Sequence, residues 1–479
     1  MVVPARVRQD GGNATIMTFE GMEFGYYTEA ERKALKAFEL YEDGKMLQAL
    51  DELETALELD PSNSAWHFNK ALTLDTVNRF DEAVNEYEIA LQLNPSDLET
   101  LNSLAIDYTR TGQYDLAIDI FEHIEKLDAN FEPCYCNRII TYTEMAQHDL
   151  AEQMFYLAQQ IKPDCALCYY NIGNSLFARG QYKKAIRCWL RTAELEPTHP
   201  QINYRIAQAC WSQGDNARAH EHFLAEIRAN PGDIDVILDF GLFLLEMGDI
   251  ESAKEKFHRI LELAPNSAVA LFYLGEIALN KADYEGAARL LNQALQHDNG
   301  LVGPRYRLAQ HALTQGLNRE ARDHLVSELK LGPEDADVLV SMGSMFLTIG
   351  DTDYAMHCLL KAIDTDCCNA DAYYGLGLVN GRKGLLENAA EFFGHALDLK
   401  PKDVRALKDS AEVYLAMGKL ANAAQRIKEA RALARGDSQL RSLEKRVQLA
   451  RLSKRLRDFV SRFKTRFILH LMTRIFHVR

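Results

Sequence analysis

The residues best suited to chemistry are four cysteines that lie close together in the chain, in the pairs Cys134-x-Cys136 and Cys165-x-x-Cys168. Four thiolates can hold a zinc ion in a tetrahedral site. Cys134 and Cys168, however, occupy the same position in a repeated pattern that is described below. Such positions often hold small apolar residues for packing, so we favour packing over a metal site and expect no cofactor.

Other segments resemble catalytic or cofactor-binding motifs, but the surrounding sequence does not have the elements that those motifs require. The segment GLGLVNG at 375–381 has glycines spaced like a dinucleotide-binding loop, but it lies in a helical pattern with no strand before it. His220 and His222 are two residues apart, which places them on different faces of a helix. No HExxH motif and no phosphate-binding loop motif occurs in the sequence. We therefore expect that the chain is not an enzyme.

The elements that position these residues follow a period of 34. Alanine recurs at this spacing twelve times, at Ala49, Ala83, Ala117, Ala151, Ala185, Ala219, Ala253, Ala287, Ala321, Ala355, Ala389 and Ala423. Eight of the twelve prolines lie twelve residues after one of these alanines. Twelve residues before the alanine, eleven of the twelve periods have glycine or another alanine. Apolar residues between these markers are spaced by three and four, which predicts helices and not strands.

Each period predicts a helix, a turn and a second helix. Nine periods have glycine midway, for example Gly112 and Gly180, where the first helix must end in left-handed backbone. Small residues let the two antiparallel helices approach closely, and a ring such as Phe121 or Trp189 fills the adjacent space. Proline then prevents continuation of the second helix.

This pattern resembles the tetratricopeptide repeat family, whose repeat length of 34 and small, alanine, aromatic, alanine, proline signature it matches over about residues 30–437. Asn299 and Cys367 stand where two of the prolines are expected. The resemblance implies an all-α fold in which antiparallel helical hairpins stack into a right-handed superhelix. Its concave groove would be built mainly by the first helix of each repeat.

The expected organisation has three parts. Residues 1–29 form an N-terminal extension that is poorly ordered or a short cap, and residues 438–479 form a basic amphipathic capping helix or tail. The twelve repeats between them are 30–63, 64–97, 98–131, 132–165, 166–199, 200–233, 234–267, 268–301, 302–335, 336–369, 370–403 and 404–437. The two end segments are too short for an ordinary catalytic domain.

In this family the groove is lined by about the second, fifth, sixth, ninth and twelfth residues of each repeat, and the resemblance implies the same here. Repeats 5 and 6 place aromatic rings and hydrogen-bonding groups at these positions, which is typical of binding hot spots. The residues expected to contact a partner are Asn69, Asn137, Tyr170, Asn171, Asn174, Phe177, Tyr204, Arg205, Gln208 and Trp211.

Three of these residues, Asn69, Asn137 and Asn171, are similar to the asparagine ladder of O-linked N-acetylglucosamine transferase, whose amides hold the backbone of an extended peptide. The ladder is interrupted here, first at Ser103. Alternatively, each asparagine caps or hydrogen-bonds a neighbouring helix, and the tyrosines pack between repeats. The carboxylate clamp for chaperone tails is not matched, because Asn174 lacks the other residues of that set.

The charge is distributed unevenly. The net charge is −15, but the chain before residue 438 has 42 basic and 67 acidic residues, a balance of −25. An acidic body argues against binding of nucleic acid, whose affinity comes mainly from Lys and Arg. No signal peptide and no membrane-spanning stretch is evident. We therefore expect a cytoplasmic protein whose nine cysteines are reduced.

The basic tail carries apolar residues spaced by three or four from Leu449 to Ile475. Part of it, up to about Leu456, is expected to cap the last hairpin, as repeat arrays require. The rest could lie on an anionic membrane, or fold into an acidic groove of its own or a partner chain. The residues expected to make this contact are Lys454, Arg455, Arg462, Phe463, Lys464, Arg466 and Phe467.

Taken together, these patterns predict a non-enzymatic adaptor that binds an extended segment or helix of a partner protein in its groove. One alternative is a membrane-surface or self-assembling scaffold anchored by the tail. Another is a substrate-recognition subunit of a separate enzyme, like the repeat arm of a glycosyltransferase.

Overall fold

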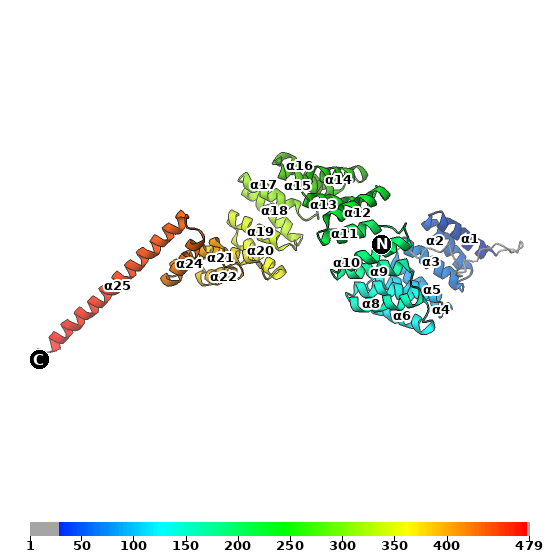
Figure 1. Cartoon of the computed structure of the whole chain (residues 1–479), viewed down its shortest axis with the longest axis horizontal. Coiled ribbons are helices and arrows are strands. Elements are labelled where there is room, and N and C mark those ends of the chain that lie inside the picture. Colours follow the sequence, from blue (N-terminus) through cyan, green and yellow to red (C-terminus); the bar gives the residue numbers. More distant parts are fainter. Residues whose placement is uncertain (1–27, 477–479) are drawn as a thin grey trace. The chain divides into compact units, whose positions relative to one another are not determined.

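The computed structural model describes the backbone of residues 28–476, and the side chains of these residues except 458 and 461–476. The expected N-terminal extension, residues 1–29, lies outside the described residues apart from its last two. The described residues form 25 α-helices and no strand (Figure 1). No helix among them has the length and apolar character that a membrane span requires.

The chain divides into two compact units, residues 1–236 and 237–479, and each is described by itself. The first unit contains α1 (Glu29–Glu42), α2 (Met46–Leu59), α3 (Ser64–Thr76), α4 (Phe80–Leu93), α5 (Leu98–Arg110), α6 (Tyr114–Leu127), α7 (Glu132–Glu144), α8 (His148–Ile161), α9 (Ala166–Ala178), α10 (Tyr182–Leu195), α11 (Ile202–Ser212) and α12 (Asn216–Ala229). Helix α13 (Ile234–Glu246) begins at the boundary between the units.

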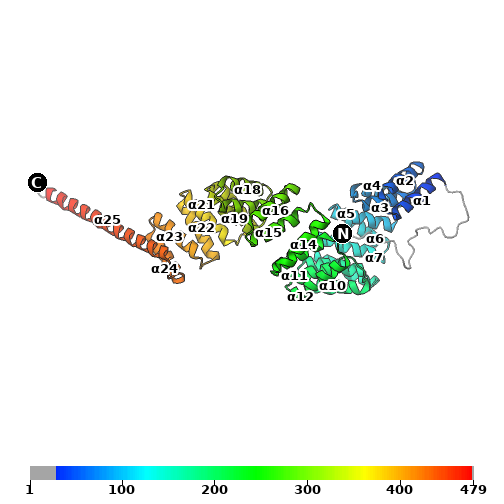
Figure 2. The ribbon, with the colours of Figure 1, turned by 90° about the horizontal axis from the view of Figure 1, so that it is seen from above.

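The second unit continues with α14 (Ile250–Leu263), α15 (Ala268–Asn280), α16 (Tyr284–His297), α17 (Pro304–Thr314), α18 (Asn318–Lys330), α19 (Ala336–Ile349), α20 (Thr352–Thr365), α21 (Ala370–Arg382), α22 (Leu386–Leu399), α23 (Val404–Ala416), α24 (Leu420–Leu433) and α25 (Ser438–Phe476). In both units, each odd-numbered helix before α25 is the first helix of a hairpin, and the next helix is its second. Figure 2 shows the hairpins of each unit from above.

The turn inside each hairpin repeats every 34 residues with the same backbone conformation. A positive φ occurs at Gly44, Asn78, Gly112, Ala146, Gly180, Gly214, Gly248, Ala282, Gly316, Gly350, Gly384 and Gly418. The left-handed turns expected at the midway glycines are therefore confirmed. Asn78, Ala146 and Ala282 adopt the same conformation, in which their β-carbons cause backbone strain that glycine avoids.

The core of each hairpin contains the repeated alanine. All twelve of these alanines have no exposed surface. Beside them, rings such as Phe121, Phe223 and Phe257 are also fully buried and fill the space between the two helices. The packing predicted from the 34-residue pattern is thus confirmed, and it defines an all-α solenoid of antiparallel helical hairpins in each unit.

Two first helices, α11 and α17, are shorter than the others and begin in an unusual way. The residue before each helix has a positive φ, 59° at Gln201 and 114° at Gly303. A buried glutamate from the second helix of the same hairpin accepts a backbone N–H there. Glu226 accepts from Tyr204 N at 3.2 Å, and Glu328 accepts from Gly303 N at 2.5 Å. These carboxylates accept hydrogen bonds from N–H groups at the helix start, which the side chain of a capping residue accepts in other helices.

The last helix, α25, covers the end of the second unit with only its first part. Leu440, Leu443 and Val447 are buried against α23 and α24. From Leu449 onward the described large apolar side chains are exposed, so the buried part of the cap ends earlier than the expected Leu456. The physical reason is that α25 continues as a single helix beyond the surface of α24 (Figures 1 and 2).

Candidate partner-binding face of the first helices

Several first helices contact the first helix of the next hairpin directly. In the first unit α3 contacts α5, α5 contacts α7, and α7 contacts α9; in the second unit α17, α19, α21 and α23 contact one another in the same order. Their side chains at repeat positions 2, 5, 6, 9 and 12 form what we call the first-helix face. This face is the place where the sequence predicts partner binding.

The buried asparagines of this face are bonded to neighbouring first helices. Asn137 Nδ2 donates to Asn102 Oδ1 at 3.1 Å, from α7 to α5. Asn171 Nδ2 donates to the Cys136 carbonyl at 3.0 Å, from α9 to α7. Both side chains are at most 8% exposed. They thus join adjacent repeats, and a partner could use these amides only by displacing those bonds.

The other predicted amides are more open to solvent. Asn69 on α3 is exposed and Asn174 on α9 is partly buried. They lie on different hairpins, with the buried Asn137 on a hairpin between them. The continuous ladder that would hold a long stretch of peptide backbone is therefore not assembled from these residues.

The aromatic residues of α9 pack against their own hairpin and the next loop. The Tyr170 ring lies 4.4 Å from the His199 ring, and the Phe177 ring lies 5.8 Å from the Trp189 ring, measured between centroids. Both Tyr170 and Phe177 remain partly exposed. They can therefore offer apolar surface to a partner while the hairpin fixes their orientation.

On α11 the structure brings four predicted residues together. The Tyr204 and Trp211 rings pack on Phe223 at 6.4 and 6.3 Å between centroids. The Arg205 guanidinium lies 5.9 Å from the Tyr204 ring centroid, and Arg205 Nη1 donates to Gln208 Oε1 at 3.3 Å. Arg205 Nε is buried and has no hydrogen-bond partner among the described atoms. A hydrogen-bond donor is thus held beside aromatic surface.

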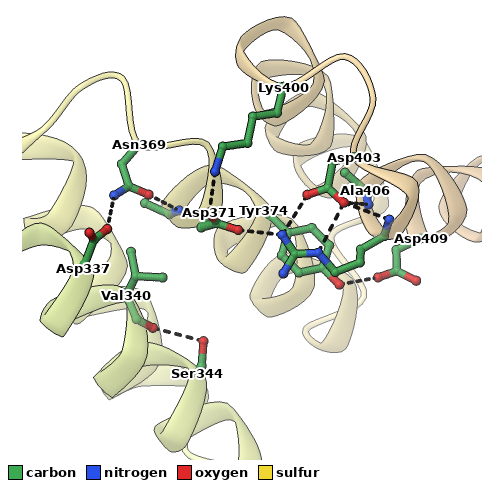
Figure 3. Close-up of polar contacts among 12 residues, drawn as sticks. Asp337, Val340, Ser344, Asn369, Asp371, Tyr374, Lys400, Asp403, Ala406 and Asp409 are labelled. Atoms are coloured by element: carbon green, nitrogen blue, oxygen red, sulfur yellow. Dashed lines mark hydrogen bonds and ion pairs between the residues drawn. The ribbon is translucent and has the colours of Figure 1, made fainter. Parts of the chain in front are cut away.

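In the second unit, the corresponding face carries a network of polar contacts across α19, α21 and α23 (Figure 3). Asp371 Oδ1 accepts from Arg405 Nη2 at 2.7 Å and Asp371 Oδ2 accepts from Lys400 Nζ at 2.7 Å. Tyr374 donates to Asp409 at 2.7 Å, and Asn369 donates to Asp337 at 3.0 Å. These charges and amides pair with one another, and so they join repeats in the way that Asn137 does.

One buried charged cluster of the first unit was not identified from the sequence. Asp107 on α5 is 1% exposed and accepts from Arg110 Nη1 at 3.0 Å, and Arg110 also pairs with Asp75 on α3. Burial and the neighbouring Asp75 charge raise the pKa of Asp107 to about 7, against the opposing effect of Arg110. The sequence shows that Asp107 lies three residues before Arg110. It does not show that Asp107 is buried, because this burial depends on the contact between α5 and α3.

The structure brings three of the four candidate cysteines together and adds a carboxylate. Cys136, Cys165 and Cys168 lie with Glu132 in one group of potential metal ligands. Burial raises the pKa of the Glu132 carboxyl to about 7, whereas hydrogen bonds from the Cys136 and Cys168 thiols lower the pKa of Cys165. Cys134 is outside the group, and its thiol donates to the Phe121 carbonyl at 3.3 Å.

The predicted tail residues are described only in part. Lys454 and Arg455 are exposed on α25. The side chains of Arg462, Phe463, Lys464, Arg466 and Phe467 lie outside the described residues. On either side of Lys454 and Arg455, the apolar side chains Leu452 and Leu456 are 54% and 63% exposed.

Comparison with known families identifies the repeats. A family model described as tetratricopeptide repeat matches residues 170–234 and 238–301, and a second model of the same description matches 382–447. A model of the N-terminal tetratricopeptide repeat region of Psidin matches 31–155. No protein in the curated collection that was compared matches the chain.

Several solved structures are similar to the chain. One is the APC/C hetero-tetramer Cut9–Hcn1, with 14% identity, a TM-score of 0.42, and coverage of 88% of this chain and 96% of that chain. Yeast Tom70 has 16% identity and a TM-score of 0.37, with 89% of this chain and 96% of that chain covered. A tetratricopeptide repeat protein from Parabacteroides merdae ATCC 43184 has 17% identity and a TM-score of 0.42, with 56% and 98% covered.

Proposed function

The chain belongs to the tetratricopeptide repeat family, and we propose that it is an adaptor that binds a partner protein on the first-helix face of repeats 5 and 6, residues 166–233. Arrays of such repeats provide extended surfaces on which other proteins are held. The partner would offer an extended segment or a helix, because both fit along a row of parallel first helices.

The observation that carries this proposal is the environment of Arg205. Its Nε–H is buried without an acceptor, although its Nη1 is held by Gln208 and its guanidinium lies over Tyr204. A buried donor without a partner costs about 1–3 kcal/mol. A side-chain carboxylate of a bound protein would accept this hydrogen bond and recover that free energy.

The surroundings of Arg205 suit a binding hot spot. Tyr204 and Trp211 are held on Phe223, so little side-chain entropy would be lost when a partner packs on them. Aromatic residues and arginine are enriched among residues that dominate binding energy. The polar groups of the second unit's face, by contrast, already pair with one another around Asp371 and Arg405.

Since Asn137 and Asn171 hold neighbouring helices, we do not assign recognition of a peptide backbone to an asparagine ladder. Recognition would depend on side chains of the partner, an apolar group beside Trp211 and an acceptor beside Arg205. The proposed site is therefore selective for sequence in its partner.

An affinity pull-down with quantitative mass spectrometry tests this function. The wild type is compared with Arg205→Ala, with the triple variant Tyr204→Ala/Arg205→Ala/Trp211→Ala, and with Arg187→Ala as a control that is exposed on the second helix α10. Circular dichroism first establishes that each variant is folded. The single substitution is needed because the triple variant also removes packing on Phe223.

A partner of this site should be recovered with wild type and Arg187→Ala, and at least about tenfold less with Arg205→Ala, since a charged hydrogen bond contributes about 1.5–3 kcal/mol. Equal recovery of every partner with all four proteins would reject the proposed site. Loss in the Arg187 control alone would place binding on the second helices.

A second candidate function is attachment to an anionic membrane surface through α25. Leu449, Leu452, Leu456 and Phe459 are 54–67% exposed and are spaced by three and four along one helix. Exposed Arg451, Lys454, Arg455 and Arg457 occupy the same segment. Basic amphipathic helices of this kind bind the interface of anionic lipids.

Flotation with anionic and with neutral vesicles tests this second function. The full chain should float with anionic lipid and less with neutral lipid, whereas a chain that ends after Arg451 should stay at the bottom. Flotation of both chains, or of neither, would remove the tail as a membrane anchor. Light scattering without lipid reports whether the same segment instead makes the protein associate with itself.

A further inference from the structure

Four potential metal ligands converge from two neighbouring first helices of the first unit. Glu132 is the first residue of α7, and Cys136 lies one turn later on the same helix. Cys165 is the residue that caps α9, and Cys168 lies in its first turn. The carboxylate oxygen and the three sulfur atoms that they offer all lie within 4.8 Å of one another.

The group is enclosed by protein. Cys136 and Cys168 are each 1% exposed and Cys165 is 7% exposed. Cys168 Sγ lies 3.1 Å from Glu132 Oε1, so a ligand of α9 already touches a ligand of α7. This cluster therefore spans the boundary between repeat 4 (132–165) and repeat 5 (166–199).

We propose that Glu132, Cys136, Cys165 and Cys168 bind one zinc ion in a tetrahedral site that joins α7 to α9. Zinc accepts thiolate and carboxylate ligands together, and Zn–S distances of about 2.3 Å place tetrahedral ligands about 3.8 Å apart. The four ligand atoms lie within 4.8 Å of one another, so none is more than about 1 Å farther from another than this geometry requires. Three sulfur ligands favour zinc over magnesium or calcium, which select oxygen.

Groups around the ligands can stabilise the excess negative charge of such a complex. Three thiolates and one carboxylate around Zn²⁺ carry a net charge of about −2. The first turns of α7 and α9 both lie at the site, and the positive ends of helix dipoles stabilise anions there. The Cys168 backbone N–H points at Cys165 Sγ at 3.4 Å, and Asn171 Nδ2 lies 3.7 Å from Cys136 Sγ.

Close packing alone explains Cys134 but not this cluster. Cys134 occupies the repeat position of Cys168, yet its thiol donates to the Phe121 carbonyl of α6, in the preceding hairpin. Packing requires small apolar side chains, and it does not require a partly buried carboxylate beside three sulfur atoms. Cys134 therefore provides a matched control, since it is an equally buried cysteine outside the ligand group.

Cobalt substitution of the full chain tests the site. The purified protein is stripped of metal under reducing conditions, titrated with Co²⁺, and then with Zn²⁺ in competition. We expect one equivalent of Co²⁺ to give the visible absorption of a tetrahedral ion and the near-ultraviolet charge-transfer band of thiolate ligands. Zinc should abolish both signals, and elemental analysis of protein expressed with zinc should give one zinc per chain.

The variants separate ligands from packing residues. Cys136→Ser and Cys168→Ser should weaken the charge-transfer band and lower the metal affinity by more than about 100-fold, beyond what the loss of an outer-shell group causes. Glu132→Gln should keep the thiolate band and shift the visible absorption. Cys134→Ser should bind cobalt like the wild type. Circular dichroism in metal-free buffer establishes that each variant is folded. If one of the two cysteine variants does not fold, the other is sufficient for the test.

Three results would overturn the proposal. The first is a cobalt spectrum without thiolate charge transfer. The second is an equal loss of binding in Cys134→Ser and Cys136→Ser, which would indicate a general effect on packing. The third is a disulfide between Cys165 and Cys168, detected by mass spectrometry, in protein purified under reducing conditions.

Discussion

The ring of Phe393 in α22 lies against the backbone of Gly377 in α21, in space that a β-carbon at position 377 would need. Such a carbon would lie 2.6 Å from Phe393 Cδ1 and Cε1. Because Phe393 is only 1% exposed, it has little room to move. We expect Gly377→Ala to lower the free energy of unfolding of the second unit by about 1–3 kcal/mol, measured by urea denaturation followed by circular dichroism.

Gly381, one turn further along α21, provides the control for Gly377. A β-carbon there would meet no atom within 4 Å, and its φ is not positive. Gly381→Ala should therefore leave the stability unchanged or raise it by up to about 1 kcal/mol, because alanine favours helix. If the two substitutions had the same effect, close packing on Phe393 would not be the reason for glycine at 377.

The buried Glu328 of α18 should be a strong determinant of how α17 begins. Its carboxylate accepts the Gly303 N–H at 2.5 Å, where backbone with φ 114° leaves no side-chain cap. We expect Glu328→Ala to lower the free energy of unfolding by about 1–3 kcal/mol, because the Gly303 N–H then loses its acceptor. Hydrogen exchange should quicken at the start of α17. Asp323→Ala, at an exposed position of the same helix, should change neither measurement.

The 34-residue period predicted the hairpins because each repeat satisfies the same local constraints. Ala389 is buried in its hairpin and Gly384 has a positive φ, as the pattern required. The sequence does carry a signal for the irregular starts of α11 and α17, at Glu226 and Glu328. Both stand at the repeat position that is alanine, isoleucine or threonine in the other ten repeats. A charged residue at a core position indicates a local irregularity.

The contacts between repeats were harder to predict than the hairpins. Asn171 reaches Cys136, and Cys168 reaches Glu132, over 35 and 36 residues. These contacts depend on the rotation of each first helix relative to the next, which the period alone does not determine. For this reason the sequence placed Cys134 in the candidate metal site, where the structure has Glu132.

The charge of Asp107 should make the stability of the first unit depend on pH. Its pKa is raised to about 7, above the value of about 3.9 in an unfolded chain. Between these values the folded state binds more protons, so the free energy of unfolding falls as the pH rises from 4 to 7, and the loss is complete above pH 7. Asp107→Asn removes this titration. The variant should therefore gain on the order of 4 kcal/mol relative to wild type between pH 4 and pH 8.

Urea denaturation of both proteins at several pH values measures the effect of Asp107. Asp119→Asn on the exposed face of α6 is the matched control, and it should run parallel to the wild type across the same range. The prediction is wrong if the difference between Asp107→Asn and wild type is constant with pH. A difference of the opposite sign would mean that the attraction of Arg110 outweighs burial.

Truncation at two positions in α25 should separate its role as a cap from its role as a binding segment. A chain that ends after Asp437 loses Leu440, Leu443 and Val447, each at most 2% exposed. It should lose at least about 3 kcal/mol of stability in α23 and α24, because each such side chain contributes about 1.5–3 kcal/mol on burial. Hydrogen exchange in α24 measures this local loss.

A chain that ends after Arg451 keeps those three side chains and the hydrogen bond from Arg451 Nη2 to the Leu420 carbonyl at 3.1 Å. It should exchange in α24 at the wild-type rate. A partner or lipid surface that is lost only from the Asp437 chain is lost because the last hairpin opens. One that is lost from both chains depends on the segment after Arg451, where Leu452 and Leu456 are exposed. Rapid exchange in α24 of the Arg451 chain would show instead that the distal helix also stabilises the cap.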